Sequence, residues 1–179
     1  PGSGKSYVVR KTTGGTGLKV VNSDDAFEKL LKDANLSLKM PPEEKEPRDM
    51  VRSRAKEITS KRKANYIEGR IGLIIDGTGR DYDKIASQSK DLRQLGYDTH
   101  MIFVNTSLDT ALQRNAERAR SVPESIVVKS WNDVQSNIGK FSQHFRENFV
   151  VVDNNDAGED VFVKAVSYTH LRAHETSEN

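Results

Sequence analysis

Short apolar runs alternate with longer amphipathic or charged segments along this chain of 179 residues. Each apolar run is only a few residues long and is rich in β-branched side chains, which is typical of strands. Strands are therefore predicted at 18–22, 71–75, 98–104 and 149–152. The run at 71–75 is apolar at almost every position, as expected for a strand that is buried on both faces of a sheet.

The segments between these runs show helical spacing of apolar residues or a high density of charge. A short helix is predicted at 5–11, ended by the glycine-rich stretch 14–17. Further helices are predicted at 25–34, 47–68, 81–95, 107–120, 123–145 and 159–166. Ser23 or Asp24 is expected to cap the helix that begins at residue 25.

Strands that alternate with helices predict an α/β fold built around a parallel sheet. In such sheets, ligands bind beyond the carboxyl ends of the strands. Polar residues follow all four predicted strands at these ends: Asp24, Asp76, Asn105 and Asn154. The sequence therefore predicts that one edge of the sheet carries the functional groups.

Composition narrows the class of protein. Charged residues make up 30% of the chain and the net charge is only +2, which is too small to indicate nucleic-acid binding by itself. The absence of cysteine excludes disulfides and thiolate metal sites, and it fits a cytoplasmic location. No apolar run approaches the length of a membrane span, so no membrane partner is expected. The sequence does not indicate an oligomeric state.

Residues 1–6 read as the second half of a phosphate-binding P-loop. Gly4, Lys5 and Ser6 fill the last three positions of the pattern G-x-x-x-x-G-K-[ST], whose opening glycine would precede Pro1 by two positions. Glycines let backbone N–H groups converge on phosphate oxygens, the lysine ammonium reaches the β- and γ-phosphates, and the hydroxyl binds Mg²⁺. The pattern predicts ATP and Mg²⁺ as cofactors, and the residues expected to hold the nucleotide are Pro1, Gly2, Ser3, Gly4, Lys5 and Ser6. The alternative is a surface turn rich in glycine and serine.

Three further segments, in the same order, strengthen this reading. Together with the P-loop half, the stretches 21–25 (V-N-S-D-D), 73–78 (L-I-I-D-G-T) and 112–123 (with R-N-A-E-R, then V-P) resemble P-loop kinases of the zeta-toxin and phage polynucleotide-kinase group. The resemblance covers about residues 1–153. It implies a three-layer P-loop NTPase kinase fold with a parallel sheet that lacks its first strand, a kinase domain at 1–166, and a tail at 167–179 that is foreign to the domain.

The same resemblance assigns roles to individual residues. Asp24 would be the general base for the acceptor hydroxyl, although Asp25 competes for that role and Asp24 could instead cap a helix. Asp76 would help to hold Mg²⁺, the alternative being a turn aspartate. Arg114 and Arg118, four residues apart on one predicted helix face, would be lid arginines that bind ATP phosphates. The alternative for this pair is a solvated face with Glu117 and Arg120 as local partners.

The sequence thus predicts ATP-dependent phosphoryl transfer to a hydroxyl acceptor, with Lys5, Asp24 and Arg118 as catalytic residues. By resemblance, the acceptor is a polynucleotide 5′-hydroxyl or a sugar-nucleotide, in the cytoplasm of a bacterial or phage-infected cell. The alternatives are a P-loop ATPase and a non-catalytic nucleotide-binding module. Because the strand before the P-loop is absent, we expect the chain alone to be poorly stable and inactive, with a gap or a forced pairing between 71–75 and 98–104.

Overall fold

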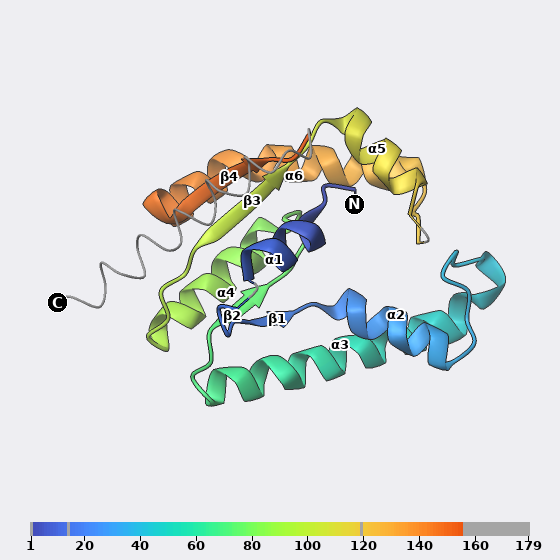
Figure 1. Ribbon diagram of the computed structural model, residues 1–179, viewed down its shortest axis with the longest axis horizontal. Coiled ribbons are helices and arrows are strands. Elements are labelled where there is room, and N and C mark those ends of the chain that lie inside the picture. Colours follow the sequence, from blue (N-terminus) through green and yellow to red (C-terminus); the bar gives the residue numbers. More distant parts are fainter. Residues whose placement is uncertain (1, 14, 119, 156–179) are drawn as a thin grey trace. The chain divides into compact units, whose positions relative to one another are not determined.

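The computed structural model describes residues 2–13, 15–118 and 120–155, in which short parallel strands alternate with helices as predicted (Figure 1). The chain divides into two units. Unit 1 holds the described parts of 1–12, 78–116 and 122 onward, and unit 2 holds 13–77 and 117–121. The helix predicted at 159–166 and the tail 167–179 lie outside the described residues.

Unit 1 is built around two parallel strands that run side by side (Figure 1). Met101 of β3 pairs with Phe149 of β4, and the ladder continues to Asn105 and Asp153. The elements of this unit are α1 (Lys5–Thr13), α4 (Tyr82–Gln94), β3 (Met101–Asn105), α5 (Leu108–Ala116), α6 (Glu124–Phe145), the 3₁₀ turn η2 (Arg146–Asn148) and β4 (Phe149–Asp153).

The core of unit 1 is aromatic. Phe103 of β3 packs against Phe141 and Phe145 of α6, and all three side chains are buried. Phe141 and Phe145 lie four residues apart in α6, and Ile138 and Val134 extend the same apolar stripe, so helical spacing directs one face of α6 onto the strands.

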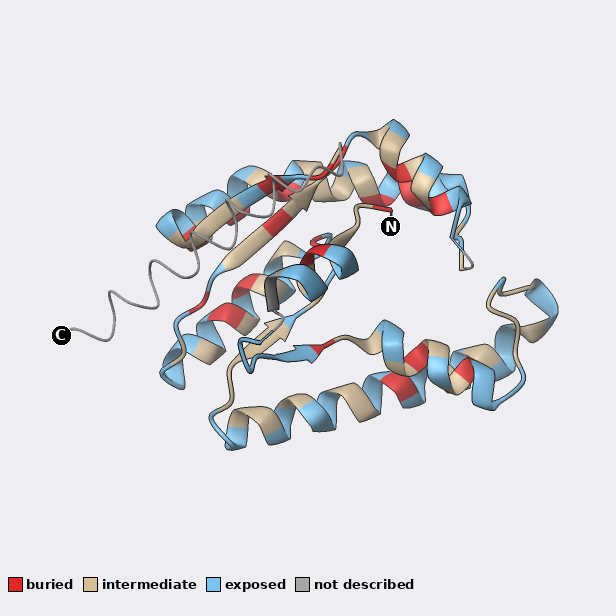
Figure 2. Cartoon of the chain, in the orientation of Figure 1, coloured by how far each residue is buried: buried red, intermediate tan, exposed pale blue. Residues whose placement is uncertain are grey.

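Unit 2 contains the other strand pair, β1 (Lys19–Val21) and β2 (Leu73–Ile75), which is also parallel. Its helices are α2 (Ser23–Asp33) and α3 (Lys45–Glu68), preceded by the 3₁₀ turn η1 (Pro42–Glu44). Buried residues lie where α2 and α3 face each other (Figure 2). They are Phe27 and Leu31 of α2 and Ala55 of α3, whose small side chain lets the helices approach closely.

The four strands form two separate pairs, β1–β2 and β3–β4, and no described residues pair β2 with β3. Three strands begin one to three residues later than predicted, whereas the carboxyl ends of all four strands lie within one residue of the predicted positions. The positions that follow the strands are therefore the ones expected to carry function.

Two predictions about helix ends are wrong. The cap of α2 is Asn22, one residue before Ser23 and two before Asp24. Helix α5 ends at Ala116, so Arg118 lies beyond it and does not share a helical face with Arg114. The cause of the second difference is Asn115, whose side-chain amide donates to the carbonyl of Val122 at 2.8 Å and accepts from the N–H of Val122 at 3.1 Å. These two bonds turn the chain where a longer helix would have continued.

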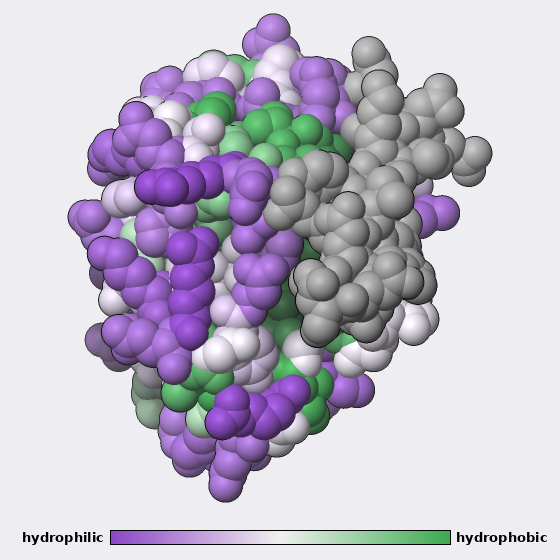
Figure 3. Space-filling view, turned by 90° about the vertical axis from the view of Figure 1, so that its left-hand side faces the viewer, coloured by the Kyte–Doolittle hydropathy of each residue, from purple (hydrophilic) through white to green (hydrophobic). Residues whose placement is uncertain are grey.

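The surface agrees with the polar composition. The face drawn in Figure 3 is mainly hydrophilic, with separate patches of hydrophobic side chains. Among the described residues, no helix has both the length and the apolar character needed to cross a membrane.

Candidate active site

The P-loop half lies in unit 1 and leads directly into α1. The N–H groups of Tyr7 and Val8 donate to the carbonyl of Gly4 at 3.0 and 3.2 Å, so the first turn of the helix starts from the loop. Lys5 is half-buried and Ser6 is exposed. The helix therefore presents its N-terminal end on the loop side, which is the arrangement that favours a bound phosphate. Pro1, the first residue of the predicted site, lies outside the described residues.

Two glycines are required by the shape of this loop. Gly2 and Gly4 have φ of +79° and +77°, a region that side-chain-bearing residues rarely adopt. A Cβ atom at Gly2 would overlap the carbonyl of Ala111, and one at Gly4 would overlap the side-chain amide of Asn154. The loop is thus held in one conformation by close packing within unit 1.

Asn154 and Arg114 anchor the loop. Asn154 is buried, and its Nδ2 donates to the carbonyl of Ser3 at 2.8 Å. Arg114 of α5 donates from Nη1 to the carbonyl of Asn154 at 2.7 Å and from Nη2 to the carbonyl of Asn155 at 3.2 Å. The guanidinium therefore holds the chain just after β4, whereas the sequence assigned it to the phosphates of ATP. That lid role remains a prediction for Arg114.

The predicted acidic residues lie in unit 2, where Asn22 joins them. The Asn22 Oδ1 accepts a hydrogen bond from the N–H of Asp24 at 2.8 Å and so caps α2. Its Nδ2 donates to Oδ2 of Asp76 at 2.9 Å. Because Asn22 is the cap, the alternative role of Asp24 as the cap of this helix is wrong.

Arg120 binds Asp24 in unit 2, a contact that the sequence did not predict. Its Nη2 lies 3.1 Å from Oδ2 of Asp24, and its Nε lies 3.0 Å from Oε1 of Glu28. The Arg120 side chain is only 11% exposed, and its guanidinium lies 5.8 Å from the centre of the Phe27 ring. The four-residue spacing of Asp24 and Glu28 on α2 was the available signal, because it places both carboxylates on one helical face.

Arg118, the predicted lid arginine, lies in the connection between α5 and α6 and is exposed. It belongs to unit 2 together with its neighbour Arg120. Hydrogen bonds and an ion pair thus connect four residues of unit 2: Asn22, Asp24, Asp76 and Arg120. In unit 1, hydrogen bonds connect the P-loop, Asn154 and Arg114.

The charged helix α3 is mostly a solvated surface. Glu57 pairs with Arg54 at 3.0 Å and with Lys61 at 2.8 Å, all on exposed side chains. The hydrogen bonds from Lys61 and Arg54 hold the pKa of Glu57 below its ordinary value. Arg52 is the exception, since its guanidinium lies 4.0 Å from the centre of the buried Phe27 ring.

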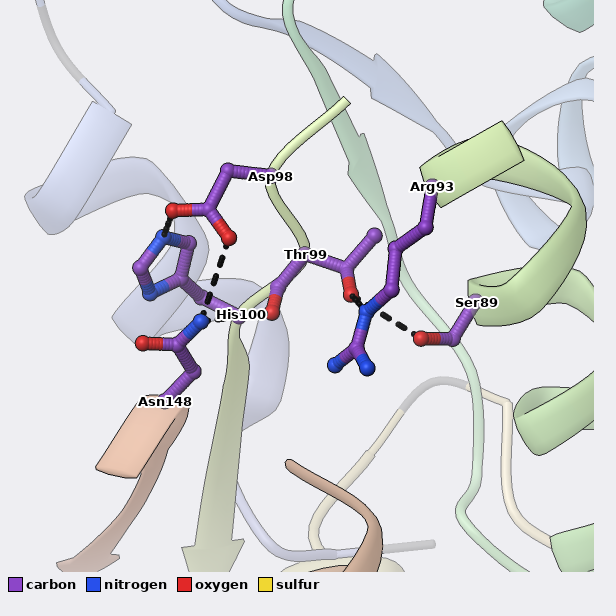
Figure 4. A network of polar contacts seen from close by, with 6 residues as sticks. All are labelled: Ser89, Arg93, Asp98, Thr99, His100 and Asn148. Carbon is purple, nitrogen blue, oxygen red and sulfur yellow. Dashed lines mark hydrogen bonds and ion pairs between the residues drawn. The ribbon is translucent and has the colours of Figure 1, made fainter. Parts of the chain in front are cut away.

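A second polar network lies at the amino end of β3, away from the strand ends that carry the predicted site (Figure 4). Thr99 bonds Ser89 at 2.9 Å and accepts from Nε of Arg93 at 2.7 Å. Asp98 contacts His100 at 2.8 Å and accepts from Asn148 at 3.1 Å. These bonds join α4 and the starts of β3 and β4, so we interpret the network as structural.

The donor chemistry fits Mg²⁺ bound together with a nucleotide. Among the described residues, no cluster of three or more His, Cys, Asp or Glu side chains forms a metal cage. Mg²⁺ that accompanies ATP needs only one or two protein oxygens, since phosphates and water complete its shell. Unit 1 offers the Ser6 hydroxyl as an oxygen donor of this kind, and unit 2 separately offers the Asp76 carboxylate.

Comparisons with known proteins are consistent with this geometry. The family model described as Zeta toxin matches residues 1–165. The fold is similar to that of a crystal structure from Chloroflexus aurantiacus J-10-fl described as a "putative kinase", with a TM-score of 0.61 and 15% sequence identity. That match covers 100% of this chain and 93% of the other. No curated protein matches the chain.

Proposed function

Because the chain belongs to the zeta toxin family, whose members are P-loop kinase-like proteins, we propose that it transfers the γ-phosphoryl group of ATP to a hydroxyl of an acceptor molecule. The observation that carries the proposal is the glycine-dependent loop ahead of α1, with Lys5 as the first residue of that helix. A loop of this shape supports phosphate binding. An ordinary surface turn would not need this glycine-dependent conformation ahead of a helix.

Each residue has a defined task in the proposed reaction. The loop N–H groups and Lys5 bind the β- and γ-phosphates, and Asp24 accepts the proton of the acceptor hydroxyl. The acceptor oxygen forms a bond to the γ-phosphorus while the bond to the β,γ-bridging oxygen breaks, and ADP leaves. Arg118 would offset the charge on the transferring group. Ser6 and Asp76 would hold Mg²⁺, which supplies further positive charge when it is bound.

We propose a sugar-nucleotide as the acceptor, because the family match is to zeta toxins. A polynucleotide 5′-hydroxyl is the second candidate, supported by the resemblance of 112–123 to a polynucleotide-kinase lid. A screen of both acceptor classes with γ-labelled ATP separates them, since label appears only in the true acceptor.

Two matched pairs of variants test the reaction in the full-length protein. Lys5→Ala should weaken ATP binding and lower kcat, whereas Lys11→Ala, which removes an exposed lysine from the same helix, should change neither. Asp24→Asn should lower kcat by about 10²–10⁴-fold and leave the Kd for ATP unchanged, because it removes the base but not the phosphate site. Asp25→Asn tests the competing carboxylate and should retain transfer if Asp24 is the base.

Calorimetric titration of ATP and labelled-phosphate transfer provide the measurements. If Lys5→Ala transferred phosphate at the wild-type rate, the assignment of residues 1–6 as a P-loop would be wrong. If the protein hydrolysed ATP without an acceptor, and Asp24→Asn hydrolysed it at the same rate, the protein would instead be an ATPase.

A further inference from the structure

We propose that Asn22 is a positioning residue that fixes the Asp24 segment and the Asp76 carboxylate relative to each other. The inference rests on the proposed function, in which Asp24 serves the acceptor and Asp76 serves the metal–nucleotide complex. Asn22 would then connect the two sides of the reaction through a single side chain.

The Asn22 amide uses both of its ends. Oδ1 accepts from the N–H of Asp24 at 2.8 Å, and Nδ2 donates to Oδ2 of Asp76 at 2.9 Å. The opposite orientation would place the NH₂ group against an N–H and the amide oxygen against a carboxylate, so both bonds would become repulsive. The two partners therefore determine the orientation of the amide, and the amide in turn orients them.

The backbone around Asn22 supports the same arrangement. Val21 pairs with Ile75 at the end of the β1–β2 ladder, and the N–H of Asp76 donates to the carbonyl of Val21 at 3.0 Å. Asn22 is still extended, with φ −138° and ψ 122°, before α2 begins at Ser23. Asn22 and Asp76 thus directly follow paired strand residues, and the side-chain bond extends the ladder beyond its last backbone bond.

A cap alone does not require asparagine at this position. Asparagine, aspartate and serine are about equally good helix caps, because each supplies an oxygen acceptor. Only asparagine also supplies an uncharged donor long enough to reach a carboxylate across the strand pair. The donor is therefore the part of the side chain that carries the positioning role, and it can be removed while the cap is kept.

The test compares Asn22→Ser, which keeps the cap and removes the donor, with Asn22→Asp, which keeps the cap and places a negative charge against Asp76. Both are made in the full-length protein, together with Asp76→Asn and the double variant Asn22→Ser/Asp76→Asn. Three quantities are measured: the Tm without ligand, the Mg²⁺ concentration that half-saturates the Tm increase in the presence of ADP, and the kcat and KM for ATP.

We expect Asn22→Ser to keep the Tm of the ligand-free protein, since the cap is retained. The Mg²⁺ concentration for half-saturation should rise and kcat should fall, each by about tenfold or more, as is usual when a group that supports a metal ligand is removed. The KM for ATP should change little. Asn22→Asp should show a larger effect of the same kind, because like charges then face each other.

The double variant decides whether Asn22 acts through Asp76. If it does, Asn22→Ser adds no further loss to Asp76→Asn, because coupled residues are not additive. A full additional tenfold loss, or wild-type Mg²⁺ dependence in both single variants at Asn22, would reduce Asn22 to a helix cap and overturn the proposal. If Asn22→Ser does not fold, Asn22→Asp provides the same comparison.

The outcome can be separated from failure of the proposed function. A wild-type protein that transfers phosphate to no acceptor, but whose Mg²⁺·ADP titration still depends on Asn22, would overturn the kinase assignment and leave the positioning role intact.

Discussion

Side-chain amides connect residues that lie far apart in the sequence of this protein. Asn154 holds the carbonyl of Ser3, 151 positions away, and Asn22 holds Asp76, 54 positions away. Asn137 of α6 donates to the carbonyls of Gly79 and Arg80 at 3.1 and 2.8 Å. An amide suits this purpose because it donates and accepts without carrying a charge that would be costly to bury.

Experiments should assign different roles to two neighbouring arginines, stability to Arg120 and catalysis to Arg118. Arg120→Ala leaves Asp24 and Glu28 without their shared partner and removes a largely buried side chain, so the free energy of unfolding should fall by about 1–2 kcal/mol. Arg118→Ala removes an exposed side chain and should change it by less than about 0.5 kcal/mol. Arg118→Ala should instead lower kcat by roughly 10²-fold if Arg118 stabilises the transferring phosphate.

Urea unfolding and steady-state kinetics measure the two effects on the same preparations. Equal kcat values for wild type and Arg118→Ala would exclude Arg118 from the mechanism. An unchanged unfolding midpoint in Arg120→Ala would show that its ion pairs contribute nothing to stability.

The residue-level predictions succeeded where the signal was local. Gly4, Lys5 and Ser6 are consecutive, so their placement at the start of α1 could be predicted from six residues. The contact between Arg120 and Asp24 joins residues 96 positions apart, and no periodicity reports such a pair. Side-chain partners of this kind depend on how the elements pack, which the sequence pattern does not specify.

At the scale of elements, α6 offers a test of helix propensity. Gly139 lies inside this helix, is exposed, and has no atom within 4 Å of the position that a Cβ would occupy. Gly139→Ala should therefore raise the free energy of unfolding by about 0.5–1 kcal/mol, because glycine loses more backbone entropy in a helix than alanine does. Gly4→Ala is the contrasting variant and should destabilise the protein, since its φ is +77°.

Chemical denaturation monitored by circular dichroism gives both values. A decrease in stability for Gly139→Ala would mean that α6 does not tolerate a side chain at this position.

Element types and order were predictable because apolar periodicity differs strongly between strands and helices in this chain. The strands at 71–75 and 149–152 and the long helix ending at Phe145 agree with the structure to within about two residues. Helix ends were harder to predict, since the side-chain hydrogen bonds of Asn115 and Asn22 override helix propensity there.

For the whole molecule, a half-buried histidine whose Nε2 atom is buried should make stability depend on pH. His144 lies against Tyr82 and Phe145, and its buried Nε2 has no hydrogen-bond partner among the described residues. Burial, followed by the positive charges of Arg93 and Lys90, lowers the pKa of His144. The unfolded chain protonates this group near pH 6.5 while the folded protein resists protonation, so stability is lost as pH falls below about 6.5 and is fully present above it.

Urea unfolding at pH 7.5 and 5.5 measures this loss. His144→Leu should show a smaller loss than the wild type, because the titrating group is gone. His100→Gln is the control, since His100 is exposed and pairs with Asp98, and it should retain the wild-type difference. Identical pH dependence in wild type and His144→Leu would exclude His144 as the cause.

The two hydrogen bonds between Asn115 and Val122 have a consequence for how chains of this family can diverge. They join the ends of the connection between α5 and α6 whatever residues lie between them. The entropy of closing such a loop changes by only about 0.6 kcal/mol for each doubling of its length. Insertions can therefore accumulate in this connection while α5 and α6 still end and begin at the same residues. This connection, which carries the exposed Arg118, is where we expect relatives to acquire different acceptor preferences without repacking a core.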